Sequence, residues 1–245
     1  ERDSRPHILW RAFTRSVEVR PYEDGISAVL LIGMLFVVAW SVQLAGWLEG
    51  PLTQPTVLLA GLTGALIARS RLNWTLGHLV GIAIGFVVIF WQTGQSADGA
   101  SILDTSRQIW ERYFAWLTVA REGGISRDLL PFELMLLAVA WVVSYLSGWV
   151  LFRWRNAWFT TILLGTGIVV NLSYRPGKFE YTLFLFIALA ILLFAHATSA
   201  SRAATWRASA IRFPSPLRRV NLGYGLIIAI FVVTISAFAP LWEPR

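Results

Sequence analysis

Two histidines, His78 and His196, stand inside otherwise apolar stretches of the sequence and are the residues best suited to bind a cofactor. A neutral imidazole there could ligate a haem iron or the magnesium of a chlorophyll. The alternative is a hydrogen bond to a neighbouring helix or to a water at the interface, and it is the interpretation that we favour. We therefore expect no cofactor, and an absorption spectrum without Soret or red bands would exclude ligation.

Catalytic and ion-transporting constellations are not apparent in this sequence. Ionisable groups within membrane segments are costly and usually functional, but Glu133 and Glu180 stand only at the outer ends of apolar stretches, where both can reach the interface. The chain has no cysteine, which rules out thiolate metal sites, disulfides and a cysteine nucleophile within it. We find no Ser-His-Asp set, paired carboxylates or phosphate-cradling glycine loop, so we predict no catalytic residue and no metal site.

Seven apolar stretches must position these residues. A helix needs about 20 apolar residues to cross a hydrocarbon core of roughly 30 Å, and lipid offers backbone groups no partners, so only helices or closed barrels can cross. The predicted spans are Ile26–Leu48, Leu52–Ala68, Leu72–Trp91, Leu129–Phe152, Ala157–Ser173, Phe179–Thr198 and Asn221–Trp242. The second and fifth are short enough to be re-entrant. Asn171 and Ser173 are expected to end the fifth span by satisfying the carbonyl groups of its last turn.

The distribution of charge supports seven crossings and predicts the orientation of the chain. Alternate connections carry 14 of the 21 basic residues, whereas 9 of the 14 carboxylates lie on the other side. Because cytoplasmic loops are enriched in Arg and Lys, we place the N-terminus in the cytoplasm and the C-terminus outside, in a bacterial inner membrane. If the second or fifth span failed to cross, basic clusters would lie on the wrong face.

The fold class that we predict is therefore all-α, a polytopic membrane bundle of about seven transmembrane helices plus an amphipathic interfacial helix. Residues 1–24 form a basic cytoplasmic tail and residues 25–245 the helical transmembrane domain. The chain starts at Glu1 and stops just beyond an apolar stretch, so we expect it to be part of a longer protein.

The long outer connection, residues 92–128, contains the amphipathic helix. Apolar residues recur at helical spacing from Ser101 to Arg121, with charged residues on the other face. The helix either caps the bundle at the membrane surface or provides a docking face for a partner domain. The residues of that face would be Trp110, Tyr113, Trp116 and Leu117.

Glycines predict where the helices pack most closely. Gly77, Gly81 and Gly85 form a ridge on the third span, and small residues at this spacing let another helix approach within van der Waals contact. Gly61 and Gly64 form a weaker version on the second span. The partner could be internal or another subunit, and we favour internal packing.

The order of these features resembles the N-terminal membrane region of TgpA-type bacterial transglutaminase-like membrane proteins, in the form found in green non-sulfur bacteria. The stretches that carry the resemblance are residues 38–47 (VAWSVQLAGW), 69–72 (RSRL), 123–128 (GGISRD), 145–153 (YLSGWVLFR) and 167–174 (GIVVNLSY). The resemblance implies membrane helices that precede an extracytoplasmic domain with a Cys-His-Asp triad. No triad residue can be assigned here, because that domain and any cysteine are missing from the sequence.

Three functions follow as hypotheses. The chain is either the non-catalytic membrane module that anchors and orients an extracytoplasmic transglutaminase-like domain, or an accessory scaffold subunit of a respiratory or photosynthetic complex that packs against lipid, quinone or pigment. Transport of a small apolar solute is a third hypothesis, because uncharged pathways leave little trace in a sequence. Expected partners are membrane lipids and other membrane subunits. Nucleic acid is rejected as a partner because the basic residues are spread over short connections beside membrane helices.

Overall fold

The protein is an all-helical bundle in the computed structural model, which describes residues 21–47, 53–95, 97, 101–124, 126–174, 180–209 and 217–238. The described part of the chain contains helices and no strand. The helices are α2 (Pro21–Ala45), α3 (Thr53–Arg69), α4 (Trp74–Gly94), α5 (Ile102–Arg121), α6 (Leu130–Arg153), α7 (Ala157–Tyr174), α8 (Tyr181–Ala208) and α9 (Leu217–Phe238). Of the predicted tail, residues 1–24, the first 20 lie outside the described residues, and residues 21–24 belong to the first turn of α2 rather than to a tail.

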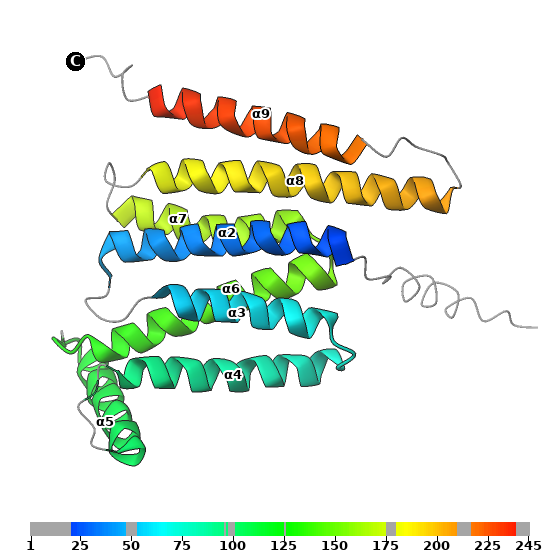
Figure 1. Ribbon diagram of the computed structural model, residues 1–245. Helices are drawn as coiled ribbons and strands as arrows, with labels where there is room; N and C mark the ends of the chain where they lie inside the picture. The colour runs from blue at the N-terminus through cyan, green and yellow to red at the C-terminus, as the bar shows by residue number, and fades with distance from the viewer. Residues whose placement is uncertain are drawn as a thin grey trace, which may run out of the picture.

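All helices except α5 lie side by side and alternate in direction along the chain (Figure 1). The connections that carry Arg69, Arg71, Arg153 and Arg155 consequently lie at one end of the bundle, which we call the basic end. Helix α5 crosses the opposite end, which we call the outer end (Figure 1). The structure thus brings to one end the arginines that the sequence distributes over separate connections.

Five helices in the described residues are long and apolar enough to cross a bilayer: α2 from Gly25, α4, α6, α7, and α8 as far as Arg202. Helix α3 has 17 residues, and the part of α9 whose side chains are described, Val220–Ser236, is apolar but equally short. The chain is therefore a membrane protein by helix length and composition, while the count of seven crossings stays a prediction.

The exposed surface supports a lipid environment. Helix α4 exposes Leu79, Ile82, Phe86 and Val87 at 57–65% of their surface. Soluble monomers rarely expose contiguous apolar patches of this extent, whereas hydrocarbon is the solvent that such a face prefers. The exposed indoles of Trp74, Trp154 and Trp158 at the basic end fit the headgroup level, where amphipathic rings gather.

Helix α2 forms the centre of the bundle, in contact with α3, α6, α7 and α8. Its Leu31, Met34 and Leu35 are almost fully buried and pack in the main core with Leu164 of α7 and Leu193 of α8. Helices α4 and α9 lie at opposite edges (Figure 1). An edge helix needs only one buried stripe, which explains why both expose so much apolar surface.

The closest approach in the bundle is the crossing of α3 over α6. A Cβ atom added to Gly64 would lie 2.1 Å from the carbonyl oxygen of Tyr145, and one added to Gly148 would lie 2.1 Å from the carbonyl oxygen of Gly61. Since these are backbone contacts, no side-chain movement could relieve them. At the basic end, the Arg69 guanidinium lies 4.2 Å from the ring centroid of Phe152 and joins the same two helices.

Helix ends agree with the predicted spans within about three residues except at the start of α2, which lies at Pro21 rather than Ile26, and in the last two helices. Helix α8 continues ten residues beyond the predicted end, Thr198, because the following Ser- and Ala-rich segment is compatible with a helix after the hydrocarbon ends. Helix α9 is shifted toward the N-terminus and ends at Phe238. Pro240 disfavours helical backbone in the residue before it, which accounts for an end before the predicted Trp242.

Candidate functional site

The outer end, where α5 lies across the bundle, is the candidate functional site. Helix α5 begins at a local cap, in which Ser101 Oγ accepts a hydrogen bond from the Asp104 backbone N–H at 3.2 Å and donates one to Asp104 Oδ2 at 2.7 Å. It ends at Arg121, two residues before Gly123, whose φ of 75° suits glycine, and Gly124 N–H donates to the Val119 carbonyl at 2.9 Å. Residues within α5 or directly beside it thus determine both of its ends.

Two contacts hold α5 against the bundle. Ile109 is 1% exposed and is the one buried residue of α5. Arg112 forms a bidentate pair with Asp128, with its Nε donating to Asp128 Oδ2 at 2.7 Å. Asp128 Oδ1 also accepts from the Leu130 N–H at 3.0 Å and so begins α6. One carboxylate therefore couples the position of α5 to the start of a spanning helix.

The Arg112 hydrogen bonds hold the pKa of the Asp128 carboxyl below its usual range, with smaller lowering contributions from the Leu130 N–H and the Arg112 charge and an opposing one from burial. A carboxyl whose pKa is lowered by folding stabilises the fold above its unfolded pKa, and this contribution is lost as the pH falls through the folded pKa. We expect acidification below about pH 4 to loosen α5.

This expectation can be measured by hydrogen exchange of the α5 amides. Exchange should rise by roughly two- to fivefold at acid pH relative to the intrinsic rate, as is typical for a partly exposed ion pair. Asp128→Asn keeps the acceptor for Leu130 but removes the charge, so it should raise exchange at neutral pH and abolish the acid response. Glu122→Gln, in the same connection, is the control. An unchanged acid response in Asp128→Asn would contradict the coupling.

The four predicted docking residues lie on α5 in an aromatic row. Trp110 is 45% exposed, and Tyr113, Trp116 and Leu117 are half-buried. Tyr113 packs edge-on against Trp110 and in parallel with Trp116, at centroid distances of 6.1 and 6.3 Å. Phe114, which was not among the predicted docking residues, belongs to the same surface because it stacks on Trp110 at 5.9 Å and is 58% exposed. The sequence signal for Phe114 was an aromatic residue directly after Tyr113.

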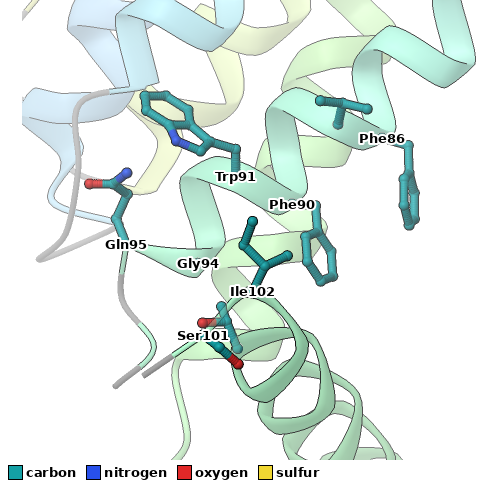
Figure 2. A pocket seen from close by; sticks show the side chains of 9 residues that line it. Phe86, Phe90, Trp91, Gly94, Gln95, Ser101 and Ile102 are labelled. Carbon is teal, nitrogen blue, oxygen red and sulfur yellow. The ribbon is translucent and has the colours of Figure 1, made fainter. Parts of the chain in front are cut away.

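An apolar groove of about 620 Å³ separates the start of α5 from the outer part of α4. Phe86, Phe90 and Trp91 line it from α4, and Ile102 of α5 lies beside Phe90 (Figure 2). Two of its polar residues, Gln95 and Ser101, lie at the end away from Phe86 (Figure 2). The lining thus changes from apolar to polar in the direction expected across a membrane interface.

A polar chain joins α2 to α7 below this end. Asn171 Nδ2 donates to Ser41 Oγ at 2.9 Å, Ser41 Oγ donates to the Val38 carbonyl at 2.7 Å, and Trp47 Nε1 donates to Asn171 Oδ1 at 2.9 Å. The Trp47 ring also stacks on Tyr174 at 4.0 Å. Asn171 was expected to cap its own helix. Its spacing from Leu164 and Ile168 on the buried face of α7 was the signal for an interhelical role.

Replacing Asn171 by Leu should lower the free energy of unfolding by about 1–2 kcal/mol, because α7 loses its hydrogen bonds to Ser41 of α2 and to Trp47 after it, and each contributes about 0.6 kcal/mol or more in a membrane bundle. Thermal unfolding in detergent would measure this effect. Ser173→Ala is the matched control, since Ser173 Oγ bonds only the Val170 carbonyl of its own helix. Equal melting temperatures for both variants would show that the polar chain does not stabilise the bundle.

Glu133 differs from expectation. It was expected to reach the interface, but it is 6% exposed, because the outer end of α6 is covered by α5 and by the ring of Trp47, which packs on Phe132. Glu180, by contrast, is exposed.

The two histidines lie on helices that do not touch. His78 is on α4, and its Nδ1 lies 2.9 Å from the Tyr145 hydroxyl of α6. The His78 ring also packs against Trp74 and Trp149, at 5.8 and 4.9 Å. His196 is 1% exposed on α8. His78 therefore makes the interhelical hydrogen bond that was the alternative to cofactor ligation. The two histidines, His78 and His196, are not brought together.

The glycine ridge of α4 faces side chains of the same protein. A Cβ on Gly77 would lie 2.8 Å from Ile67, one on Gly81 would lie 2.5 Å from the Tyr145 ring, and one on Gly85 would lie 2.3 Å from Trp141 Nε1. Aromatic rings of α6 thus occupy the space that a side chain would fill at Gly81 and Gly85. The second-span glycines, expected to be weaker, make the closer backbone contact.

Among the described residues, no three His, Asp or Glu side chains gather to hold a metal. The fold and site define a helical membrane bundle with an amphipathic helix across one end. Comparisons of the chain with protein-family models, curated proteins and solved structures return no match. The resemblance to TgpA-type proteins therefore stays a prediction.

Proposed function

We propose that this chain is a membrane-embedded module that anchors and orients an extracytoplasmic domain, with α5 as the surface on which that domain rests. The observation that carries the proposal is the fixed position of α5. The Arg112–Asp128 pair and buried Ile109 hold the helix, while Trp110 and Phe114 stay exposed. Aromatic side chains supply large contact area at low entropic cost, which suits a docking surface.

Charge supports the orientation in this proposal. The arginine-bearing turns lie at the end opposite α5 (Figure 1), and the positive-inside rule assigns that end to the cytoplasm of a bacterial inner membrane. Helix α5 would then face the extracytoplasmic side, with seven crossings between the tail and the C-terminus. The domain that it orients is transglutaminase-like if the resemblance of the membrane region holds.

An accessory scaffold role is the second candidate, and α9 favours it. Helix α9 contacts only α8 among the described helices, and it exposes Ile227, Ile230 and Phe231 at more than half of their surface. A larger membrane complex could cover this face. Fixed-stoichiometry purification with other membrane subunits supports this candidate over the first.

Photo-crosslinking tests the docking role. A benzophenone amino acid at Trp110 or Phe114 in the complete gene product should form crosslinks to residues of the same polypeptide outside 1–245, identified by mass spectrometry. The same probe at Arg107, which is 80% exposed, is the control and should not. Crosslinks only to lipid would show that α5 is a surface cap, and crosslinks to a stoichiometric second chain would favour the scaffold.

A further inference from the structure

A second hollow, of about 460 Å³, lies at the basic end between the α6–α7 turn and α8. Arg155 and Trp158 line it from the turn and the start of α7, and Phe194 and Arg202 line it from α8. The aromatic docking surface and the glycine contacts do not involve these residues. The hollow therefore has no part in the function proposed above.

Two guanidinium groups line this hollow from different segments, Arg155 from the α6–α7 turn and Arg202 from α8. Arg155 and Arg202 are both exposed, and the ion pairs found among described residues include neither of them. The carboxylates whose side chains are described belong to α5, to the connections beside it, or to outer helix ends; they are Asp104, Glu111, Glu122, Asp128, Glu133 and Glu180. Among described side chains, the hollow thus carries positive charge that no nearby carboxylate offsets.

The backbone of the turn supports the role of Arg155. Its φ of 51° is in the left-handed region, which a long side chain seldom adopts and which glycine or asparagine would occupy at lower cost. The adjacent Asn156 instead begins α7, where its Oδ1 accepts from the Phe159 N–H at 2.9 Å. The turn therefore holds an arginine, at some conformational cost, beside the hollow.

The rest of the lining is amphipathic. Trp158 and Phe194 pack with ring centroids 4.3 Å apart, and the hydroxyl-bearing Thr198 and Ser201 lie on the same side of α8 as Arg202. One turn deeper along α7, Ile162 is 61% exposed toward lipid. From the hollow onto Ile162, which lies outside it, the surface thus changes from cationic and hydroxylated to aromatic and then aliphatic, which matches the order of phosphate, glycerol and acyl chain in a phospholipid.

We propose that this hollow binds one anionic phospholipid of the leaflet at the basic end. Arg155 and Arg202 bind its phosphodiester, Thr198 and Ser201 donate hydrogen bonds to its headgroup oxygens, and an acyl chain lies on Trp158 and Ile162. Guanidinium groups suit phosphate because their N–H donors form a planar fork. The assignment depends on membrane insertion, but not on the docking role of α5.

Native mass spectrometry of the purified chain tests the site with phosphatidylglycerol and phosphatidylcholine as probes. The protein should retain one phosphatidylglycerol in preference to phosphatidylcholine. Arg155→Gln/Arg202→Gln should weaken that retention roughly thirtyfold, since a basic residue contributes about 1 kcal/mol near an anionic lipid surface. Arg71→Gln/Arg121→Gln removes the same charge from exposed positions outside the hollow and should change retention less than twofold.

Three results would overturn the assignment. Equal retention of the two lipids by the unaltered protein would exclude a headgroup site, and this comparison needs no variant to fold. An equal loss of phosphatidylglycerol retention in both double variants would show that net charge, and not this hollow, attracts the lipid. Displacement of the lipid by millimolar inorganic phosphate would identify a site for a free anion instead.

Discussion

Replacing Gly148 by Leu is expected to prevent the bundle from folding, with little protein recovered as a monodisperse species in detergent. The Cβ alone would lie 2.1 Å from the Gly61 carbonyl oxygen and 3.1 Å from the Ala65 nitrogen. Overpacking a core usually costs 1–3 kcal/mol, and here the opposing atoms are backbone, so about 3 kcal/mol or more is expected. Helices α3 and α6 would have to separate.

The control for this substitution is Gly223→Leu. Gly223 is also helical, in α9, and an added Cβ would meet nothing within 4 Å. Size-exclusion chromatography and thermal unfolding of both variants separate the specific clash from a general cost of a larger side chain. Recovery of Gly148→Leu with the stability of Gly223→Leu would show that α3 and α6 do not cross at these glycines.

The second large effect is expected where Trp141 of α6 fills the notch at Gly85 of α4. Gly85→Ala alone should destabilise the protein by about 1–3 kcal/mol, since its Cβ would lie 2.3 Å from Trp141 Nε1 and the indole is 4% exposed. Trp141→Leu alone should cost about as much, through the cavity that it leaves. The double variant should be less destabilised than the sum of the two single losses, because the shorter Leu side chain leaves room for the Ala methyl group.

A double-mutant cycle measured by unfolding in detergent quantifies this coupling, which should lie between about 0.5 and 3 kcal/mol. Gly223→Ala combined with Trp141→Leu provides the reference, because α9 contacts α8 and not α6, and distant substitutions add within about 0.5 kcal/mol. Additivity in the Gly85 cycle would mean that the ring does not occupy the notch.

The sequence predicted the fold class and most helix ends because hydropathy and proline positions act locally. It ranked the glycines in the wrong order, since the closeness of Gly64 to α6 depends on Gly148, which no spacing within α3 reveals. Asn171 was assigned to its own helix for the same reason, because its partners Ser41 and Trp47 lie on or after α2. Burial of Glu133 depends on where α5 comes to lie.

The candidate site was predictable in part. The amphipathic period located α5 and four of its aromatic and apolar residues, yet the Arg112–Asp128 pair that fixes the helix joins residues on separate segments. Likewise, Arg155 and Arg202 were counted only as orientation signals. Their convergence on one hollow follows from the packing of α7 against α8, which charge counting does not describe.

Accessibility of single cysteines to a membrane-impermeant maleimide tests the central claim most directly, and residues 1–245, expressed as such, contain no cysteine that would have to be replaced first. In intact cells, Glu122→Cys and Trp242→Cys should react at once, whereas Arg71→Cys and Arg155→Cys should react only after permeabilisation. Reaction of Arg71→Cys or Arg155→Cys from the same side as Glu122→Cys would contradict a bundle that carries its arginines on one face of the membrane and α5 on the other.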